Sequence, residues 1–211
     1  MNQLDLFGDS NISKDVFSYD SRPVIIENGE YLFVTNFFNR LDSDIFFHLL
    51  KEKILWRQES MNIYGKQVEF PRLTAWYGND DKPYSFSGIT LKPIAWIDEI
   101  LEIKTRIEPT ANITFNSVLL NLYRDGKDSI SWHTDAEPEL GRNPIIASVN
   151  FGATRTFQLR HTITKQKIEI ELSHGSLLIM KGELQHYWQH QVPKTKKTMG
   201  ERINLTFRVI K

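Results

Sequence analysis

The second half of the chain is a succession of short apolar segments, and this pattern constrains the fold more than any other feature. In one segment Ile168, Ile170 and Leu172 alternate with Glu169 and Glu171, which is the period of a strand with one buried face. Many short strands separated by turns predict a β-sandwich or barrel. We expect a jelly roll, whose mouth can also hold a metal. The predicted strands are Ser117–Tyr123, Ile145–Phe151, Thr156–His161, Lys167–Leu172, Ser176–Met180, His186–Val192 and Ile203–Ile210.

The first half predicts two helices and a hairpin. Leu41–Leu55 indicates an amphipathic helix capped by Asp42 or Ser43, and Pro93–Ile107 a second helix with proline at its first position. Between them, residues 56–77 predict a hairpin with its tip near Tyr64. The predicted fold class is therefore α+β, mainly β, with two helices flanking a jelly-roll core, also called a double-stranded β-helix.

Composition narrows the class of protein. The chain has no cysteine, which excludes disulfides, zinc–thiolate sites and cysteine nucleophiles. Lys plus Arg and Asp plus Glu are 26 each, so a nucleic-acid partner would need local basic patches. No apolar run reaches the roughly 18 residues of a membrane span, and the first residues lack the order of a signal peptide. We expect a monomeric, cytoplasmic protein without a membrane partner.

A His-x-Asp tripeptide carries the first sign of chemistry. In a strand or its exit loop, residues i and i+2 share a face, so His133 and Asp135 can converge on one ion. A third ligand must come from another strand, where His186 and His190 share a face and the periodicity leaves both open. Two histidines and one carboxylate occupy one face of an octahedral metal, as in non-haem Fe(II) oxygenases, and leave the other face open.

The last predicted strand has one polar and one apolar face. Its polar face consists of Arg202, Asn204, Thr206 and Arg208, and its apolar face of Ile203, Leu205 and Phe207. Burying such a polar row is costly unless it meets anionic or polar partners. Guanidinium groups bind carboxylates through both charge and geometry, so this face suits a dicarboxylate co-substrate.

Taken together, the motifs resemble a known family. They are Asn121-Leu-Tyr123-Arg-Asp-Gly126, Trp132-His133-Thr-Asp135, Ile146-Ala-Ser-Val-Asn-Phe-Gly152, Gly175-Ser-Leu-Leu-Ile-Met180, His190 and Arg202-x-Asn204-x-x-x-Arg208. Over roughly residues 56–211 the chain resembles the AlkB family of Fe(II)- and 2-oxoglutarate-dependent dioxygenases, and is most similar to its branch for the repair of alkylated DNA. This resemblance implies a single domain over residues 23–211, with helices and a base-recognition lid in 23–112 and the jelly-roll core in 113–211.

The resemblance also implies roles for individual residues. It selects His190 over His186, so that His133, Asp135 and His190 would bind Fe(II). It implies that Arg202 binds the distal carboxylate of 2-oxoglutarate. The metal-chelating end of the co-substrate would meet Asn121, Tyr123, Asn204, Thr206 and Arg208. With dioxygen, the co-substrate would be decarboxylated while an N-methyl group is hydroxylated and then lost as formaldehyde.

A base whose pairing edge is to be oxidised must first leave the duplex, and aromatic faces then hold it by stacking. The resemblance assigns this stacking to Phe86, with Tyr84 beside it. It suggests that Glu137 contacts the base edge and that Arg72 lines the pocket or binds a phosphate. Tyr64 matches the finger aromatic that fills the gap left by a flipped base. Alkylated DNA, single- or double-stranded, is therefore the expected partner.

The N-terminal segment, residues 1–22, is polar and irregular, which predicts a flexible tail. Within it, Gln3-Leu4-Asp5-Leu6-Phe7 resembles the pentapeptide by which bacterial replication and repair proteins dock on the DNA polymerase sliding clamp. Leu6 and Phe7 would enter an apolar pocket of the clamp, and Gln3 would supply hydrogen bonds. This reading favours a bacterial source and DNA as the substrate.

The sequence thus predicts a DNA oxidative demethylase acting on lesions such as N1-methyladenine and N3-methylcytosine. Two alternatives stay open at this point. The same chemistry could act on RNA, tRNA or a small molecule, or the fold could serve as a non-catalytic nucleic-acid-binding module.

Overall fold

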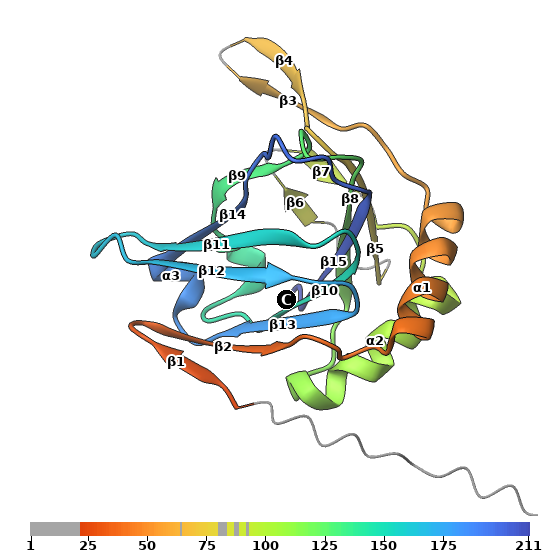
Figure 1. Cartoon of the computed structure of the whole chain (residues 1–211). Helices are drawn as coiled ribbons and strands as arrows, with labels where there is room; N and C mark the ends of the chain where they lie inside the picture. Colours follow the sequence, from red (N-terminus) through yellow and green to blue (C-terminus); the bar gives the residue numbers. More distant parts are fainter. Residues whose placement is uncertain (1–21, 64, 80–83, 87–88, 92) are drawn as a thin grey trace, which may run out of the picture.

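Two antiparallel β-sheets lie face to face and form the jelly roll that the strand pattern predicts (Figure 1). The computed structural model describes residues 22–63, 65–79, 84–86, 89–91 and 93–211. The larger sheet has the order β1 (Val24–Ile26), β2 (Gly29–Val34), β13 (Ser176–Lys181), β10 (Ile146–Gly152), β15 (Arg202–Arg208), β8 (Ser117–Tyr123) and β5 (Leu73–Gly78). The smaller sheet has the order β12 (Lys167–Leu172), β11 (Arg155–His161), β14 (Trp188–Val192) and β9 (Ile130–His133).

The two faces of strand β15 lie in different surroundings. Its residues Ile203, Leu205 and Phe207 are fully buried in the hydrophobic cluster beneath the helices. The alternate residues of β15 point the other way, into the space between the sheets, as the sequence predicts. A second cluster, containing residues such as Phe157 and Leu178, fills the rest of that space. One strand therefore supports a dry core on one side and a polar site on the other.

Helices α1 (Arg40–Lys53) and α2 (Asp98–Ala111) lie against the larger sheet (Figure 1). The prediction of both helices is confirmed, but their first residues differ from those expected. The side chain of Asn39 accepts a hydrogen bond from the backbone N–H of Asp42 at 2.9 Å, so the cap is Asn39 rather than Asp42 or Ser43.

Helix α2 begins at Asp98 and not at Pro93, because the preceding segment is held by a strand. Ile94 forms a bridge with Tyr77 of β5, and its backbone N–H donates to the carbonyl of Trp76 at 2.9 Å. These contacts keep residues before Asp98 extended, so the helix starts only after the bridge. Proline is instead found near the end of the helix, at position 109.

A hairpin of β3 (Ser60–Ile63) and β4 (Lys66–Glu69) projects from one end of the jelly roll (Figure 1). The hairpin confirms the expected tip near residue 64, where Gly65 has φ +78°. The predicted hairpin was too long, since β5 joins the larger sheet through β8. A shorter antiparallel pair consists of β6 (Tyr84–Phe86) and β7 (Ile89–Leu91).

One further prediction is wrong in detail, and another is not tested by the structure. The segment 186–192 was expected to be all strand, but α3 (Leu184–Tyr187) occupies its start, so His186 does not share a strand face with His190. The tail predicted for residues 1–22 and the motif at Gln3–Phe7 lie outside the described residues, save for the last position. Among the helices that the structure describes, none is long and apolar enough to cross a bilayer.

Candidate metal and co-substrate site

Three side chains converge at one end of the space between the sheets. His133 is the last residue of β9, and it pairs directly with His190 of β14. Asp135 follows two residues later in a loop. The Asp135 carboxylate oxygens lie 3.9 Å from His133 Nε2 and 3.9 Å from His190 Nε2. One ligand atom from each of the three residues lies within 4.8 Å of the other two, as required of a metal centre.

The protonation and orientation of these groups fit a divalent cation. His133 Nδ1 lies 2.8 Å from the carbonyl oxygen of Ser131, which places the proton on Nδ1 and leaves Nε2 as a free donor to a metal. Asp135 is buried, and within the described part of the chain its Oδ1 has no hydrogen-bond partner. An unpaired buried carboxylate oxygen is costly, and a bound cation would remove that cost. Imidazole and carboxylate ligands together are the donor set of Fe(II) oxygenases.

The local electrostatics favour the metal-binding forms of the ligands. Burial raises the pKa of the Asp135 carboxyl, but the charge of Arg208, whose Nη2 lies 3.0 Å away, and the two histidines outweigh burial and lower that pKa to about 2. Burial, with the neighbouring His133, lowers the pKa of His190 to about 3. At neutral pH Asp135 is therefore ionised and His190 is neutral, the states in which both bind metals.

The structure decides between the two candidate histidines. His186 lies on the surface in α3, and its Nε2 is 2.9 Å from Asn143 Oδ1. His190 is buried beside Asp135, with its ring 4.1 Å from that of His133 between centroids. Phe157 also packs against His190, with 5.3 Å between the two ring centroids. The structure therefore brings His190, and not His186, to the His-x-Asp pair.

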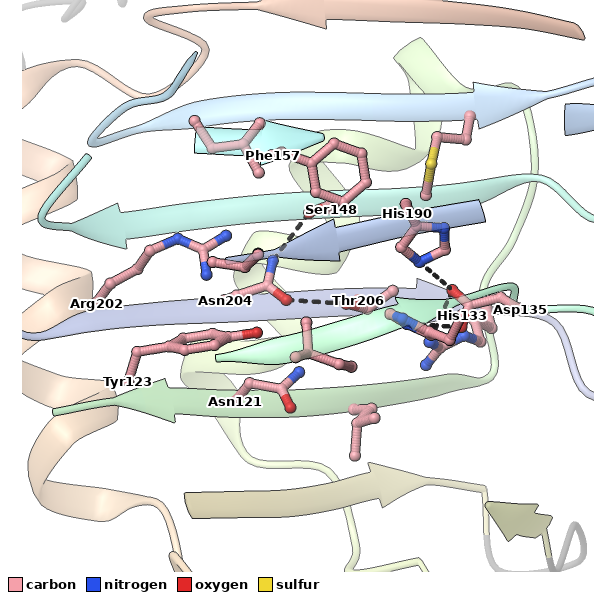
Figure 2. A pocket seen from close by; sticks show the side chains of 16 residues that line it. Asn121, Tyr123, His133, Asp135, Ser148, Phe157, His190, Arg202, Asn204 and Thr206 are labelled. Atoms are coloured by element: carbon pink, nitrogen blue, oxygen red, sulfur yellow. Dashed lines mark hydrogen bonds and ion pairs between the residues drawn. The ribbon is translucent and has the colours of Figure 1, made fainter. Parts of the chain in front are cut away.

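A polar pocket extends from this centre between the sheets (Figure 2). Arg208 stands at the metal end, while Arg202 and Tyr123 lie at the opposite end. Arg202 is almost wholly buried, stacks over the Tyr123 ring at 4.8 Å, and donates from Nη2 to Asn150 Oδ1 at 2.6 Å. Its Nε and Nη1 have no hydrogen-bond partner among the residues described. A buried guanidinium with two unused donors is suited to a carboxylate.

Between the two arginines, amides and hydroxyls line the pocket. Asn204 donates to Ser148 Oγ at 2.8 Å, and its Oδ1 accepts from the Thr206 hydroxyl at 3.0 Å. Asn121 lies opposite Asn204 in the register of β8 and β15, and its Oδ1 accepts from Arg72 Nε at 2.8 Å. The six residues predicted for the co-substrate all line this one pocket.

Some lining residues escaped the sequence prediction. Ser148 of β10 lines the pocket, Asn150 of the same strand accepts a hydrogen bond from Arg202, and Phe157 and Met180 contribute apolar surface to the pocket. The two polar residues alternate within an otherwise apolar strand, as the row on β15 does, so the same facing rule would have found them. The apolar pair carries no signal that separates it from ordinary core.

A second, larger cavity of about 600 Å³ adjoins the metal centre, with His133 in the wall of both. Met61 and Val68 of the hairpin and Phe70 beyond it form an apolar wall. Two of the predicted substrate residues, Arg72 and Glu137, line this cavity. Tyr64, and the side chains of Tyr84 and Phe86, lie outside the described residues. Trp132 also lines the cavity, with Arg160 over its ring at 4.3 Å, and was not predicted.

Comparisons with known proteins agree with this geometry. Residues 31–208 match the family model described as the 2OG-Fe(II) oxygenase superfamily. Human alpha-ketoglutarate-dependent dioxygenase alkB homolog 3 is 44% identical over 179 residues, which are 80% of this chain and 62% of that protein. Human DNA oxidative demethylase ALKBH2 is 37% identical over 187 residues, which are 83% of this chain and 72% of that protein.

A solved structure, that of OsALKBH1, superposes with a TM-score of 0.59 at 18% identity, covering 89% of this chain and 100% of that one, and so supports the fold. The chain belongs to the 2OG-Fe(II) oxygenase superfamily and, within it, to the AlkB family. It spans about three fifths, 62%, of the length of alkB homolog 3. Membership confirms the prediction of Fe(II), 2-oxoglutarate and dioxygen as the cofactors.

The two histidines provide a direct test of the metal centre. We expect His190→Ala to weaken Mn(II) binding by more than the roughly 100-fold that follows loss of an outer-shell partner, because a ligand itself is removed. His186→Ala, four residues away and exposed, should leave the affinity unchanged. Isothermal titration of both variants with Mn(II), a redox-stable substitute for Fe(II), measures the difference. Equal affinities would show that His190 is not a ligand.

Proposed function

We propose that the protein is an oxidative dealkylase of DNA, which removes methyl groups from bases such as N1-methyladenine and N3-methylcytosine. The observation that carries this proposal is the position of His133, which borders both the polar pocket and the large cavity. A metal there would stand between a bound dicarboxylate and a bound base. The human relative ALKBH2 is a DNA oxidative demethylase by name, which supports the same substrate class. Bound Fe(II) with 2-oxoglutarate and dioxygen supplies the oxidising power for hydroxylating the methyl group.

In this proposal the protein holds the metal through His133, Asp135 and His190, and leaves the remaining positions for the co-substrate and dioxygen. Arg202 binds the distal carboxylate of 2-oxoglutarate, and its two unused nitrogens support that role. Arg208 already contacts Asp135, so it holds the carboxylate ligand and the metal-chelating end of the co-substrate. Asn121, Tyr123, Asn204 and Thr206 line the path between the two ends.

The large cavity is the proposed site of the flipped base. Its apolar wall suits the faces of a nucleobase, and Arg72 and Glu137 offer polar groups to its edge or phosphate. Phe86, with Tyr84 beside it, completes the stack in this proposal, and Tyr64 fills the gap that the flipped base leaves in the strand. In this proposal the residues from 23 to 112 supply the flanking helices and the base-recognition lid, and those from 113 to 211 supply the jelly-roll core.

The alternatives have less support. A non-catalytic module has no need of three converging ligands and a buried arginine with unused donors, and both are found here. RNA would fit the same cavity, because a single flipped base presents the same faces and edge. The choice between DNA and RNA therefore rests on the relatives and on direct measurement.

Removal of the Arg202 guanidinium tests the co-substrate role. We expect Arg202→Met to raise the Kd for 2-oxoglutarate by at least about 30-fold, since truncating a buried, hydrogen-bonded charge pair costs about 2 kcal/mol or more. Arg160→Met is the control, because Arg160 donates a hydrogen bond to Gln189 at 2.8 Å and lies outside the polar pocket. This variant should bind 2-oxoglutarate with the Kd of the parent. Titration of the Mn(II)-loaded proteins with 2-oxoglutarate measures both. A Kd within twofold of the parent for Arg202→Met would contradict the assignment.

The reaction itself is tested with defined oligonucleotides. Protein reconstituted with Fe(II) and 2-oxoglutarate under argon is exposed to air with N1-methyladenine in single-stranded DNA, duplex DNA or RNA. Mass spectrometry should show loss of the methyl group from DNA together with succinate, and His133→Ala should stop both. Faster demethylation of the RNA would show that RNA, rather than DNA, is the preferred substrate. Succinate without demethylation would remove the base-repair function and keep the oxygenase.

We further propose that the protein works as a cytoplasmic monomer recruited to DNA by its N-terminal tail. The support is the sequence of Gln3–Phe7, in which two leucines and a phenylalanine stand in an otherwise polar segment. Such a segment can order upon binding to a sliding clamp of the bacterial type.

The double variant Leu6→Ala, Phe7→Ala tests this recruitment. Surface plasmon resonance on an immobilised bacterial clamp should show binding of the parent protein. The variant should show no binding, because the two apolar anchors are removed. Demethylation of free single-stranded DNA should stay unchanged in the variant. Equal clamp binding by both proteins would remove the tail from the proposal.

A further inference from the structure

Asp135 is the one proposed metal ligand whose backbone lies outside the regular strands. β9 ends at His133, and residues 134–137 form neither helix nor strand. Asp135 is nevertheless buried, so its backbone N–H needs a partner within the protein. That partner is a side chain: the N–H donates to Oε1 of Gln185 at 2.9 Å.

Gln185 is itself buried, in the short helix α3 that connects β13 to β14. A backbone N–H can only donate, so chemistry fixes the orientation of the amide with its oxygen toward Asp135. The other end of the amide is poorly satisfied, because Nε2 meets only the sulfur of Met180, at 3.7 Å, among the hydrogen bonds described. A buried glutamine with one strong and one weak contact is costly, and the strong contact is the one made to the ligand residue.

The position of α3 gives this contact a geometric consequence. The helix leads directly into β14, which carries His190 five residues after Gln185. The amide therefore ties the loop of one ligand to the element that delivers another. His133 and His190 are already held together by strand pairing. Without the amide, the Asp135 loop would lose this hydrogen bond to that frame.

We propose that Gln185 is a positioning residue of the metal centre, which fixes the Asp135 backbone so that its carboxylate faces both histidines. This inference rests on the proposed function, because it takes the three side chains as ligands of one metal. Groups of this kind beside a metal ligand set its orientation, and their loss commonly weakens metal binding by about 10- to 100-fold.

The test uses three variants of the full chain. Gln185→Met keeps the approximate length of the side chain and removes the accepting oxygen. Gln185→Glu restores an oxygen at the same distance along the side chain. Gln191→Met is the matched control, because Gln191 lies on β14 outside the polar pocket and donates to Gln158 Oε1 at 2.6 Å.

Mn(II) affinity and the visible absorption spectrum of the Co(II) protein are measured for each variant, with circular dichroism of the metal-free forms. We expect Gln185→Met to raise the Kd for Mn(II) about 10- to 100-fold and to change the Co(II) bands, which report the arrangement of ligands. Gln185→Glu should recover much of the affinity, and Gln191→Met should match the parent. Parent-like affinity and Co(II) bands in a folded Gln185→Met would overturn the proposal.

If Gln185→Met fails to fold, Gln185→Asn tests the inference in its place. This variant keeps the amide and withdraws its oxygen from Asp135 by one methylene group, so the same loss of affinity is expected, and an unchanged Kd overturns the inference. Failure of the metal site itself gives a different result. The parent would then bind Mn(II) no better than His190→Ala, which would remove the proposed function rather than the role of Gln185.

Discussion

The burial of a charged row between two sheets is the constraint on which the rest of the structure depends. Arg202 and Arg208 enter the space between the sheets from a strand whose every residue is buried. Arg208 is balanced by Asp135, and the far end of the row has no carboxylate hydrogen-bonded to Arg202 in the region described. Burying such charge is tolerated when a ligand completes it. An anion bound beside Arg202 would offset part of the free energy that this row costs the folded protein.

The same constraint explains the division of labour between the two cores. The helices and the outer face of the larger sheet form a large hydrophobic cluster, which contributes stability away from the polar pocket. The inner cluster adjoins the polar pocket. Side chains such as Tyr123 and Met180 belong to the cluster and also line the pocket. His133 and His190 are held side by side by direct pairing of neighbouring strands. A rigid apolar layer behind a polar layer is what keeps such a site in place.

Much of this could be predicted from the sequence, because alternation along a strand is local. The faces of β15 follow from the order of its residues, and β8 and β12 were placed with their correct ends. Features set by tertiary contacts could not be predicted. The start of α2 depends on a bridge between Ile94 and Tyr77. Strand periodicity alone left both His186 and His190 open, because it did not show the helical turn before β14, and only the family resemblance selected His190. Gln185 gave no signal, because its role exists only once α3 meets the Asp135 loop.

The hairpin of β3 and β4 forms a sheet of its own, separate from the two that hold the ligands. It nevertheless supplies Met61 and Val68 to the wall of the large cavity. A substitution in the hairpin can therefore reshape the wall of this cavity without altering the strand pairing that holds His133 beside His190.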